Sequence, residues 1–278
     1  MVSALLWAIR ICLLLFAIYC FCAAPNLLHR KLSLKHLTDF DYAHRGLYNN
    51  EKGIPENSLA AFERAVQGRY GIELDVRETR DHVLVVHHDE TLERSCNDPR
   101  RVCDVPLEEL QHLSLFGTTE YIPTFQEVLE RVNGRVPLIV ELKTDFQNRS
   151  LPEQVYSYLR RYSGIYCVES FDPMAMRWFK QHAPNVTRGQ LSFMSKTKGM
   201  PFLDKVKRFL LGYLLVDCIS RPDFIAYGYE TDANISYRFV VHVFRPMLAA
   251  WTVRDTETSD QLRQEYDVQI FERFRAER

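Results

Sequence analysis

Short apolar segments of β-type composition alternate with helical segments from residue 37 onward, and this alternation is the strongest constraint on the fold. Eight strands are predicted, at residues 40–44, 72–76, 137–142, 164–169, 186–191, 223–226, 247–252 and 267–271. The clearest helices are predicted at residues 58–66, 124–132, 152–162 and 173–182. Eight strands that alternate with helices over about 240 residues predict an α/β fold, the (β/α)₈ TIM barrel, whose usual length is about 250 residues.

An open, doubly wound sheet is the other fold with this alternation. It is less favoured, because the sequence contains neither a GxGxxG nor a GxxxxGK[ST] motif. One segment breaks the alternation: residues 80–88 are typical of a short hairpin, with Asp81 and His82 at the turn. We therefore expect a barrel over residues 37–278, with a short hairpin insertion after strand 2.

A hydrophobic segment precedes the predicted barrel. Residues 4–24 are apolar except for Arg10 and Tyr19, and a transmembrane helix needs about 20 such residues. Arg10 would have to extend toward the membrane interface. A cleaved signal peptide is the alternative, but Ala23 and Ala24 follow a cysteine and precede Pro25, which makes a poor cleavage site. We expect residues 1–36 to form a membrane anchor and a juxtamembrane linker.

The charges beside this segment predict its orientation. Arg30, Lys31 and Lys35 follow it, whereas only Arg10 lies near its start. Positive charge is enriched on the cytoplasmic side of membrane segments, so the large domain is expected to be cytoplasmic.

Composition limits the possible partners. The 35 Lys and Arg residues nearly balance the 36 Asp and Glu residues, so the net charge is -1 and no basic excess indicates nucleic-acid binding. The 7 cysteines include no CxxC pair, so a zinc site built from thiolates is not indicated. Nothing in the sequence predicts the oligomeric state.

Charged residues and histidines gather at the ends of the first three predicted strands and after the hairpin. The carboxyl ends of barrel strands form one face, where TIM-barrel active sites lie. The strand ends therefore bring together residues that are far apart in the sequence. The residues concerned are His44, Arg45, Glu73, Asp75, His88, Glu141 and Lys143.

This set of side chains suits phosphate chemistry. Glu73 and Asp75 lie two residues apart, so they face the same side of their strand, and burying them is costly without a cation. Three carboxylates form a hard, oxygen-rich site that suits Mg²⁺ or Ca²⁺. Arginine and lysine can bind a phosphate, and two histidines can act as acid and base near neutral pH. Each of these motifs alone is more often a structural or surface feature. Their order at successive strand ends favours a functional site.

These motifs together resemble the glycerophosphodiester phosphodiesterase family. The resemblance runs from about residue 39 to about residue 271 and is specific as an ordered set. The matching stretches are AHRG at 43–46, PENS at 55–58, IELDVRETRD at 72–81, VVHHDETLERS at 85–95, IPTFQEVLE at 122–130, LIVELK at 138–143, SFDP at 170–173 and WTVRD at 251–255.

The resemblance implies a role for each of these residues. Glu73, Asp75 and Glu141 correspond to the ligands of one divalent cation, Mg²⁺ or Ca²⁺. His44 and His88 correspond to the catalytic pair; His88 is chosen over His87 because it directly precedes an aspartate. The implied substrate-binding residues are Arg45 and Lys143 for the phosphate, Glu56 in support, and Phe171 and Trp251 as aromatic walls.

The implied reaction is metal-dependent hydrolysis of glycerophosphodiesters to glycerol 3-phosphate and an alcohol. Two alternatives remain: a lysophospholipase D that acts on membrane lysophospholipids, and a catalytically inactive, membrane-tethered binding protein.

Two segments depart from the pattern. The last strand reads YDVQIFERF and lacks the family's glycine-rich run, so its geometry is expected to differ. Residues 194–215 are basic and apolar; an ordinary barrel helix is favoured over an amphipathic helix on anionic lipid.

Overall fold

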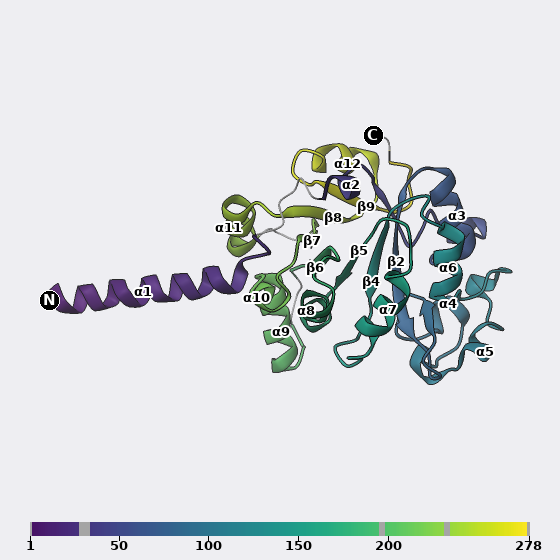
Figure 1. Ribbon diagram of the computed structural model, residues 1–278, viewed down its shortest axis with the longest axis horizontal. Helices are drawn as coiled ribbons and strands as arrows, with labels where there is room; N and C mark the ends of the chain where they lie inside the picture. The colour runs from purple at the N-terminus through teal and green to yellow at the C-terminus, as the bar shows by residue number, and fades with distance from the viewer. Residues whose placement is uncertain (1, 28–33, 195–197, 231–233, 277–278) are drawn as a thin grey trace.

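The computed structural model describes residues 2–27, 34–194, 198–230 and 234–276. Its main body is a closed barrel of parallel strands with helices around it (Figure 1). The barrel strands are β1 (Tyr42–His44), β2 (Gly71–Glu78), β4 (Leu138–Leu142), β5 (Tyr166–Ser170), β6 (Arg188–Ser192), β7 (Phe224–Gly228), β8 (Met247–Val253) and β9 (Val268–Phe271). These correspond to the eight predicted strands, so the TIM barrel is confirmed.

The barrel closes where β1 pairs with both β2 and β9. Tyr42 lies opposite Gly71 on one side and Ile270 on the other. The last strand, whose sequence departs from the family pattern, therefore completes the barrel. Its pairing with β8 is irregular, with a register shift between Ala250 and Val253.

Helices follow most of the strands and cover the outside of the barrel (Figure 1). The predicted helices are all present, and three begin at a side-chain cap, on Ser58, Thr124 and Asp172. The helices are α1 (Val2–Ala23), α2 (Lys35–Thr38), α3 (Leu59–Gln67), α4 (Glu93–Cys96), α5 (Leu107–Leu110), α6 (Phe125–Val132), α7 (Leu151–Leu159), α8 (Pro173–His182), α9 (Phe202–Gly212), α10 (Asp217–Ser220), α11 (Ile235–Phe244) and α12 (Thr256–Leu262), with short 3₁₀ turns at Asn50–Lys52, Val102–Asp104 and Leu115–Gly117.

The insertion after β2 is larger than a hairpin. Strand β3 (Leu84–Val86) pairs antiparallel with the end of β2, as predicted. The chain then continues through α4 and α5 before it reaches α6. This segment has an apolar cluster of its own, formed by Val85, Leu92, Val102, Val105, Leu110, Leu115 and Ile122. Its helices are too short to leave a periodic apolar pattern, so the sequence indicated only the hairpin.

The strands divide their side chains between two environments. In β2, Ile72, Leu74 and Val76 point outward and pack with Phe62 and Val128 of the surrounding helices. The alternate residues of β2 point into the barrel, because successive strand residues face opposite sides. The barrel interior is apolar at the amino ends of the strands, where Tyr42, Ile139, Phe224, Leu34 and Leu37 cluster. The predicted boundary after residue 36 thus falls within α2, whose Leu37 belongs to this cluster.

Helix α1 projects from the body as a straight rod (Figure 1). Its residues Ser3–Ala23 are long and apolar enough to cross a membrane, and most of them are exposed, whereas Ala23 at the end of the helix is buried against the body. A membrane anchor and a signal sequence both have this composition. The end of α1 contacts the barrel: Tyr19 Oη lies 2.8 Å from Ser236 Oγ. Arg221 donates hydrogen bonds to the backbone oxygens of Phe21 (3.0 Å) and Ala24 (2.6 Å).

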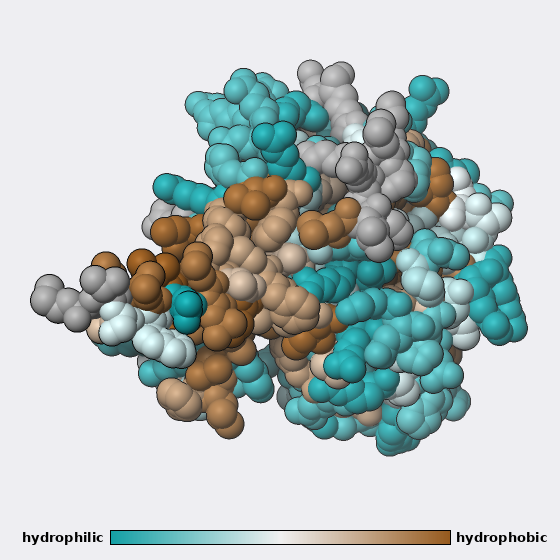
Figure 2. Space-filling view, turned by 60° about the vertical axis from the view of Figure 1, so that its left-hand side comes forward, coloured by the Kyte–Doolittle hydropathy of each residue, from teal (hydrophilic) through white to brown (hydrophobic). Residues whose placement is uncertain are grey.

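Helix α9 does not pack as the ordinary barrel helix that we expected within residues 194–215. Its apolar side chains Phe202, Leu203 and Phe209 are exposed to 76%, 71% and 51%. Within α9 only Gly212 is buried. Hydrophobic residues gather on this side of the molecule (Figure 2). The favoured interpretation of residues 194–215 was therefore wrong for α9, because the helix turns its apolar face away from the barrel. Lys196 lies outside the described residues.

Asp217, at the start of α10, is expected to destabilise the fold at neutral pH. Both carboxylate oxygens are buried and accept no hydrogen bond, and this burial raises the pKa of the carboxyl well above its usual value. A raised carboxyl pKa reduces stability above the unfolded pKa of about 4. We expect Asp217→Asn to increase the free energy of unfolding at pH 7 by about 1–3 kcal/mol. Urea unfolding at pH 7 and pH 4 checks this, since the gain should shrink at the lower pH.

Candidate active site

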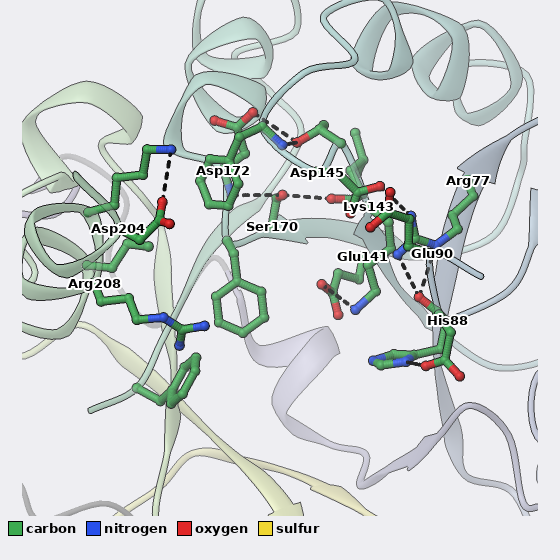
Figure 3. Close-up of a pocket in the computed structure, with 18 of the residues that line it drawn as sticks. Arg77, His88, Glu90, Glu141, Lys143, Asp145, Ser170, Asp172, Asp204 and Arg208 are labelled. Carbon is green, nitrogen blue, oxygen red and sulfur yellow. Dashed lines mark hydrogen bonds and ion pairs between the residues drawn. The ribbon is translucent and has the colours of Figure 1, made fainter. Parts of the chain in front are cut away.

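The carboxyl ends of the strands open into two adjoining cavities. The larger cavity, of about 580 Å³, lies between α9 and the ends of β4 and β5 (Figure 3). The smaller cavity, of about 330 Å³, lies over the barrel mouth. His88, Glu141, Lys143 and Phe171 line both cavities. The smaller cavity is also lined by His44, Arg45, Glu56, Glu73 and Trp251. The two cavities therefore contain every predicted site residue except Asp75, which lies buried beneath them.

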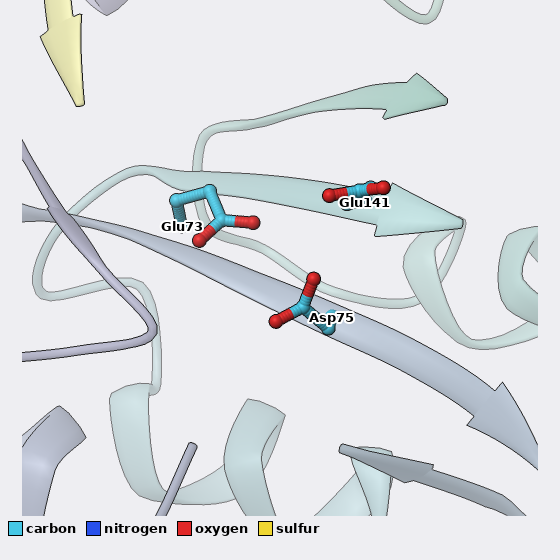
Figure 4. A group of neighbouring side chains, drawn as sticks. All are labelled: Glu73, Asp75 and Glu141. Carbon is cyan, nitrogen blue, oxygen red and sulfur yellow. The ribbon is translucent and has the colours of Figure 1, made fainter. Parts of the chain in front are cut away.

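Strand register brings the three predicted metal ligands together. Asp75 of β2 lies directly beside Glu141 of β4. Glu73 is two residues before Asp75 and faces the same side. Each residue offers a carboxylate oxygen, and these oxygens lie within 4.8 Å of one another (Figure 4). All three residues are buried.

The electrostatics of this cluster favour a bound cation. Burial raises the pKa of Glu73 well above its usual range, and the neighbouring charges of Asp75 and Glu141 raise it further. Burial also raises the pKa of Glu141. Asp75 Oδ1 is buried and accepts no hydrogen bond, although Lys143 Nζ forms an ion pair with it at 3.0 Å. Lys143 and Arg45, whose Nε lies 3.6 Å from Asp75 Oδ2, offset part of the negative charge. A bound divalent cation would stabilise the ionised form of the buried carboxylates, and the oxygen-rich donor set fits such a cation.

Lys143 lies at the edge of the carboxylate cluster. Its Nζ is 2.8 Å from Glu141 Oε1. Although burial lowers its pKa, the charges of Asp75 and Glu141 raise it by more, so the pKa is above the usual lysine value. Lys143 is therefore a positive charge held at the point where both cavities meet.

His44 is held by a carboxylate that follows the last strand. Its Nδ1 lies 2.8 Å from Glu272 Oε2, and its Nε2 lies 3.8 Å from Glu73 Oε2. Glu272 also accepts hydrogen bonds from Tyr48 Oη (2.8 Å) and Arg254 Nε (2.8 Å). Although burial raises the pKa of Glu272, its contacts with His44 and Arg254 bring it well below the usual value. An ionised Glu272 fixes the ring of His44 with Nε2 directed toward the carboxylates.

The two adjacent histidines differ in position. His88 Nδ1 lies 2.7 Å from Asp89 Oδ1, and the side chain borders both cavities. His87 is 3% exposed and contacts the backbone oxygen of Asp89 (2.9 Å) and Ser95 Oγ (2.7 Å). Burial lowers the pKa of His87 to about 4. His87 is therefore neutral and buried, whereas His88 faces both cavities.

Arg45 occupies a tight turn between β1 and α3. Gly46 has a φ of 80°, and a Cβ there would meet the backbone of Ala61 at 2.9 Å, which explains why glycine follows the arginine. The Arg45 backbone N–H donates to Glu73 Oε2 at 3.0 Å. Its guanidinium donates to Glu56 Oε1 at 2.7 Å. The turn thus orients Glu73, a candidate metal ligand, and places the positively charged guanidinium of Arg45 at the cavity wall.

Glu56 is connected to His88 through Arg94. Arg94 Nη2 donates to Glu56 Oε1 at 2.7 Å, and Arg94 Nε donates to Asp89 Oδ2 at 2.6 Å. Although burial raises the pKa of Glu56, the Arg94 hydrogen bonds and the charge of Arg45 lower it to about 2. Asp89, which contacts His88, therefore belongs to the same ionic network as Arg45. Glu56 supports the site from behind the arginine.

The two predicted aromatic walls contact each other. The rings of Phe171 and Trp251 lie 5.7 Å apart, and both pack edge-on against Phe193. Phe171 borders both cavities, whereas Trp251 borders only the smaller. Phe193 also contacts α9, because the guanidinium carbon of Arg208 lies 5.5 Å from the centre of its ring.

Several residues of the site were not predicted. Glu169 lies beside Glu141 on β5, and Glu272 directly follows β9. Both are charged residues at strand ends, which is the pattern that identified Glu141, so that rule could have found them. Arg94 lies in a short helix; the stretch 85–95 that carries the family resemblance includes it, but no role was predicted for it.

The comparisons with known proteins agree with one another. The family model described as the glycerophosphoryl diester phosphodiesterase family matches residues 44–269. A glycerophosphodiester phosphodiesterase of Caldanaerobacter subterraneus is 37% identical over 160 residues, which are 54% of this chain and 65% of that protein. One of Bacillus altitudinis is 38% identical over 131 residues, which are 45% of this chain and 48% of the relative. Each match thus spans less than two thirds of the relative's length.

Solved structures show the same fold. A phosphodiesterase of Oleispira antarctica, solved with its product sn-glycerol-3-phosphate, superposes with a TM-score of 0.67 at 21% identity, over 84% of this chain and 92% of that one. A glycerophosphodiester phosphodiesterase of Thermotoga maritima gives 0.63 at 24% identity, over 84% and 94%.

Proposed function

Since this chain belongs to the glycerophosphoryl diester phosphodiesterase family, we propose that it hydrolyses glycerophosphodiesters to glycerol 3-phosphate and an alcohol. One observation supports this most strongly. Three buried carboxylates from adjacent strands gather at a cavity that His44, His88, Arg45 and Lys143 also line. A phosphodiester needs charge neutralisation together with an acid and a base, and this arrangement supplies each of them.

Glu73, Asp75 and Glu141 would hold one divalent cation, Mg²⁺ or Ca²⁺. A cation bound there supplies positive charge to the phosphate oxygens as the reaction makes them more anionic. Arg45 and Lys143 provide further positive charge at the cavity wall. Phe171 and Trp251 would contact the alcohol part of the substrate.

His44 and His88 would move the protons. One imidazole accepts a proton from the attacking hydroxyl as its oxygen bonds to phosphorus; the other donates a proton to the alcohol oxygen as its bond to phosphorus breaks. If the attacking group is water, the products form in one step. If it is the neighbouring glycerol hydroxyl, a cyclic phosphate forms first and water opens it. The carboxylates of Glu272 and Asp89 would fix the two rings.

The direct test is release of glycerol 3-phosphate from glycerophosphocholine by the full chain in detergent. Mg²⁺, Ca²⁺ and a chelator are compared. Release that depends on metal supports the proposal and identifies the preferred cation. Release that persists unchanged in chelator would contradict the role proposed for the carboxylates.

Glu272→Gln is expected to lower kcat roughly tenfold or more with little change in KM, because His44 loses its charged partner while the cavity keeps its shape. Glu272→Asp keeps the charge and should recover part of the activity. Steady-state kinetics with glycerophosphocholine checks both variants. If kcat for Glu272→Gln equals that of the unmodified enzyme, Glu272 does not position His44.

Lysophospholipids are a second candidate substrate class, favoured by the larger cavity. Its walls include the apolar side chains of Phe146, Phe193, Met200 and Leu211. A cavity of this size can accept a drug-sized apolar group. Choline release from lysophosphatidylcholine, measured beside the first assay, separates the two substrate classes. An inactive binding protein would hydrolyse neither.

Helix α1 is proposed to remain attached as a membrane anchor. Cleavage near Ala24 would remove Tyr19 and the Phe21 carbonyl, both of which contact the barrel region. The basic residues after α1 favour a cytoplasmic domain; Arg30 and Lys31 lie outside the described residues. External protease on intact cells tests the orientation: a domain that is digested from outside would refute it.

A further inference from the structure

Helix α9 has an apolar face that is largely exposed in the described structure, although the ring of Phe209 packs on Tyr213. Phe202, Val206 and Phe209 lie at helical spacings of four and three residues, so they share one face with Leu203 beside them. Their exposed fractions run from 37% for Val206 to 76% for Phe202. A surface helix ordinarily turns such a face toward the core. A contiguous exposed apolar patch of this kind marks a site of contact with a partner or a membrane.

Helix α11 lies on one side of the base of α1 and α10 on the other, with α9 beyond α10 (Figure 1). Helix α11 also exposes apolar residues on the surface: Ile235 is 82% exposed and Val243 is 56% exposed. Brown, hydrophobic residues continue from α1 over the neighbouring helices in the space-filling view (Figure 2). The α9 patch is therefore part of the side of the molecule from which the candidate membrane helix projects.

The orientation of α1 relative to this side is fixed by several contacts. The ring of Phe239 in α11 lies 5.7 Å from Phe16 and 5.4 Å from Tyr19. Arg221, which follows α10, donates hydrogen bonds to the last turn of α1 and to Ala24. If α1 crosses a bilayer, the base of α1 lies at the bilayer surface, and α9 and α11 lie beside it.

The charges of α9 complement an anionic surface. The helix has three basic residues, Lys205, Lys207 and Arg208, and one acidic residue, Asp204. Lys207 and Arg208 line the larger cavity and so lie at its rim, whereas Lys205 is exposed outside the cavity lining. Basic residues beside an apolar face are the composition of helices that lie in a lipid interface. Phosphate headgroups attract such residues, whereas a neutral apolar partner protein would not.

We propose that α1 crosses the lipid bilayer and that the side of the molecule formed by α9 and α11 rests on the bilayer surface. Helix α9 then inserts its apolar face among anionic headgroups. The opposite face of α9, including Asp204, Arg208 and Leu211, lines the larger cavity (Figure 3). The rim of that cavity therefore lies at headgroup level. The inference depends on the proposed retention of α1, but not on the substrate that the enzyme hydrolyses.

The test uses the full chain in vesicles that contain a small fraction of photoactivatable phospholipid. One set of vesicles is phosphatidylcholine alone; the other also contains phosphatidylglycerol. After illumination, labelled peptides are mapped by mass spectrometry. We expect label on α1 in both sets, and label on α9 that rises in the anionic set. Helix α5, in the insertion after β2, provides the background level.

A variant with Phe202→Ser, Leu203→Ser and Phe209→Ser should lower α9 labelling about tenfold or more while α1 labelling persists. These side chains are exposed, so the fold should tolerate the changes; unchanged turnover of soluble glycerophosphocholine in detergent verifies this. Ile165→Ser is the matched control, because Ile165 is also exposed (41%) but lies at the amino end of β5. It should leave α9 labelling unchanged.

The outcomes separate the two proposals. Label on α1 with only background label on α9 would overturn the α9 contact and leave the anchor intact. Background label on both helices would refute the anchor as well. Crosslinks between the α9 peptides of two protein copies, in place of lipid label, would overturn the proposal in favour of self-association.

Discussion

Alanine at His44 or at His88 is expected to lower kcat for glycerophosphocholine by about 10²-fold or more. Each imidazole has its Nδ1 held by a carboxylate, 2.8 Å away at Glu272 for His44 and 2.7 Å away at Asp89 for His88. Each is therefore oriented for proton transfer at Nε2. Removing either ring removes one of the two proton transfers that the reaction needs. Steady-state kinetics at saturating Mg²⁺ or Ca²⁺ measures the effect.

His87→Asn is the natural comparison for the His88 variant, because the two histidines are adjacent but only His88 borders the cavities. The His87 change should lower the free energy of unfolding, since His87 makes interior hydrogen bonds to Asp89 and Ser95. The kcat of the folded enzyme should change little. Thermal unfolding separates stability from activity. Normal activity in a folded His88→Ala enzyme would remove His88 from the mechanism, and the same holds for His44.

The barrel was predictable because its signal is repeated along the chain. Each strand is a short apolar run, and the polar residues that interrupt the runs, such as Glu73 and Asp75, lie on the face that lines the barrel. Parallel register then brought Asp75 beside Glu141 without any further information. In a barrel, residues at the ends of neighbouring parallel strands lie close together, so a linear pattern was sufficient to predict that these carboxylates are neighbours.

The residues around that centre were less predictable. Glu272 reaches His44 only because β9 closes the barrel against β1, a long-range pairing that no local pattern encodes. Arg94 reaches Glu56 from the insertion, whose short helices have no clear periodicity. For α9 the sequence showed an amphipathic helix correctly, but amphipathicity does not tell whether the apolar face meets the barrel or the surroundings. That choice depends on tertiary packing.

Asp75→Asn is expected to lower activity by about 10³-fold or more and to weaken binding of the divalent cation. Asp75 is the most enclosed of the three carboxylates, with no exposed surface, and it lies between its ion pair with Lys143 and its hydrogen bond from Asn57 Nδ2 at 2.8 Å. Asparagine keeps the size of the side chain and removes its charge. Lys143 would then be the dominant charge beside Glu141, which disfavours a second cation at the same place.

Glu169→Gln is the matched control for this variant. Glu169 is equally buried and lies beside Glu141 on β5, but it is outside the group of three whose oxygens lie within 4.8 Å of one another. Because Glu169 contributes no oxygen to that group of three, its loss of charge is expected to change cation affinity much less than the Asp75 change. Calorimetric titration with Mg²⁺ and Ca²⁺ reports binding without relying on turnover. Equal loss of cation affinity in both variants would show that the binding group extends to β5, whereas unchanged affinity in Asp75→Asn would place the cation elsewhere.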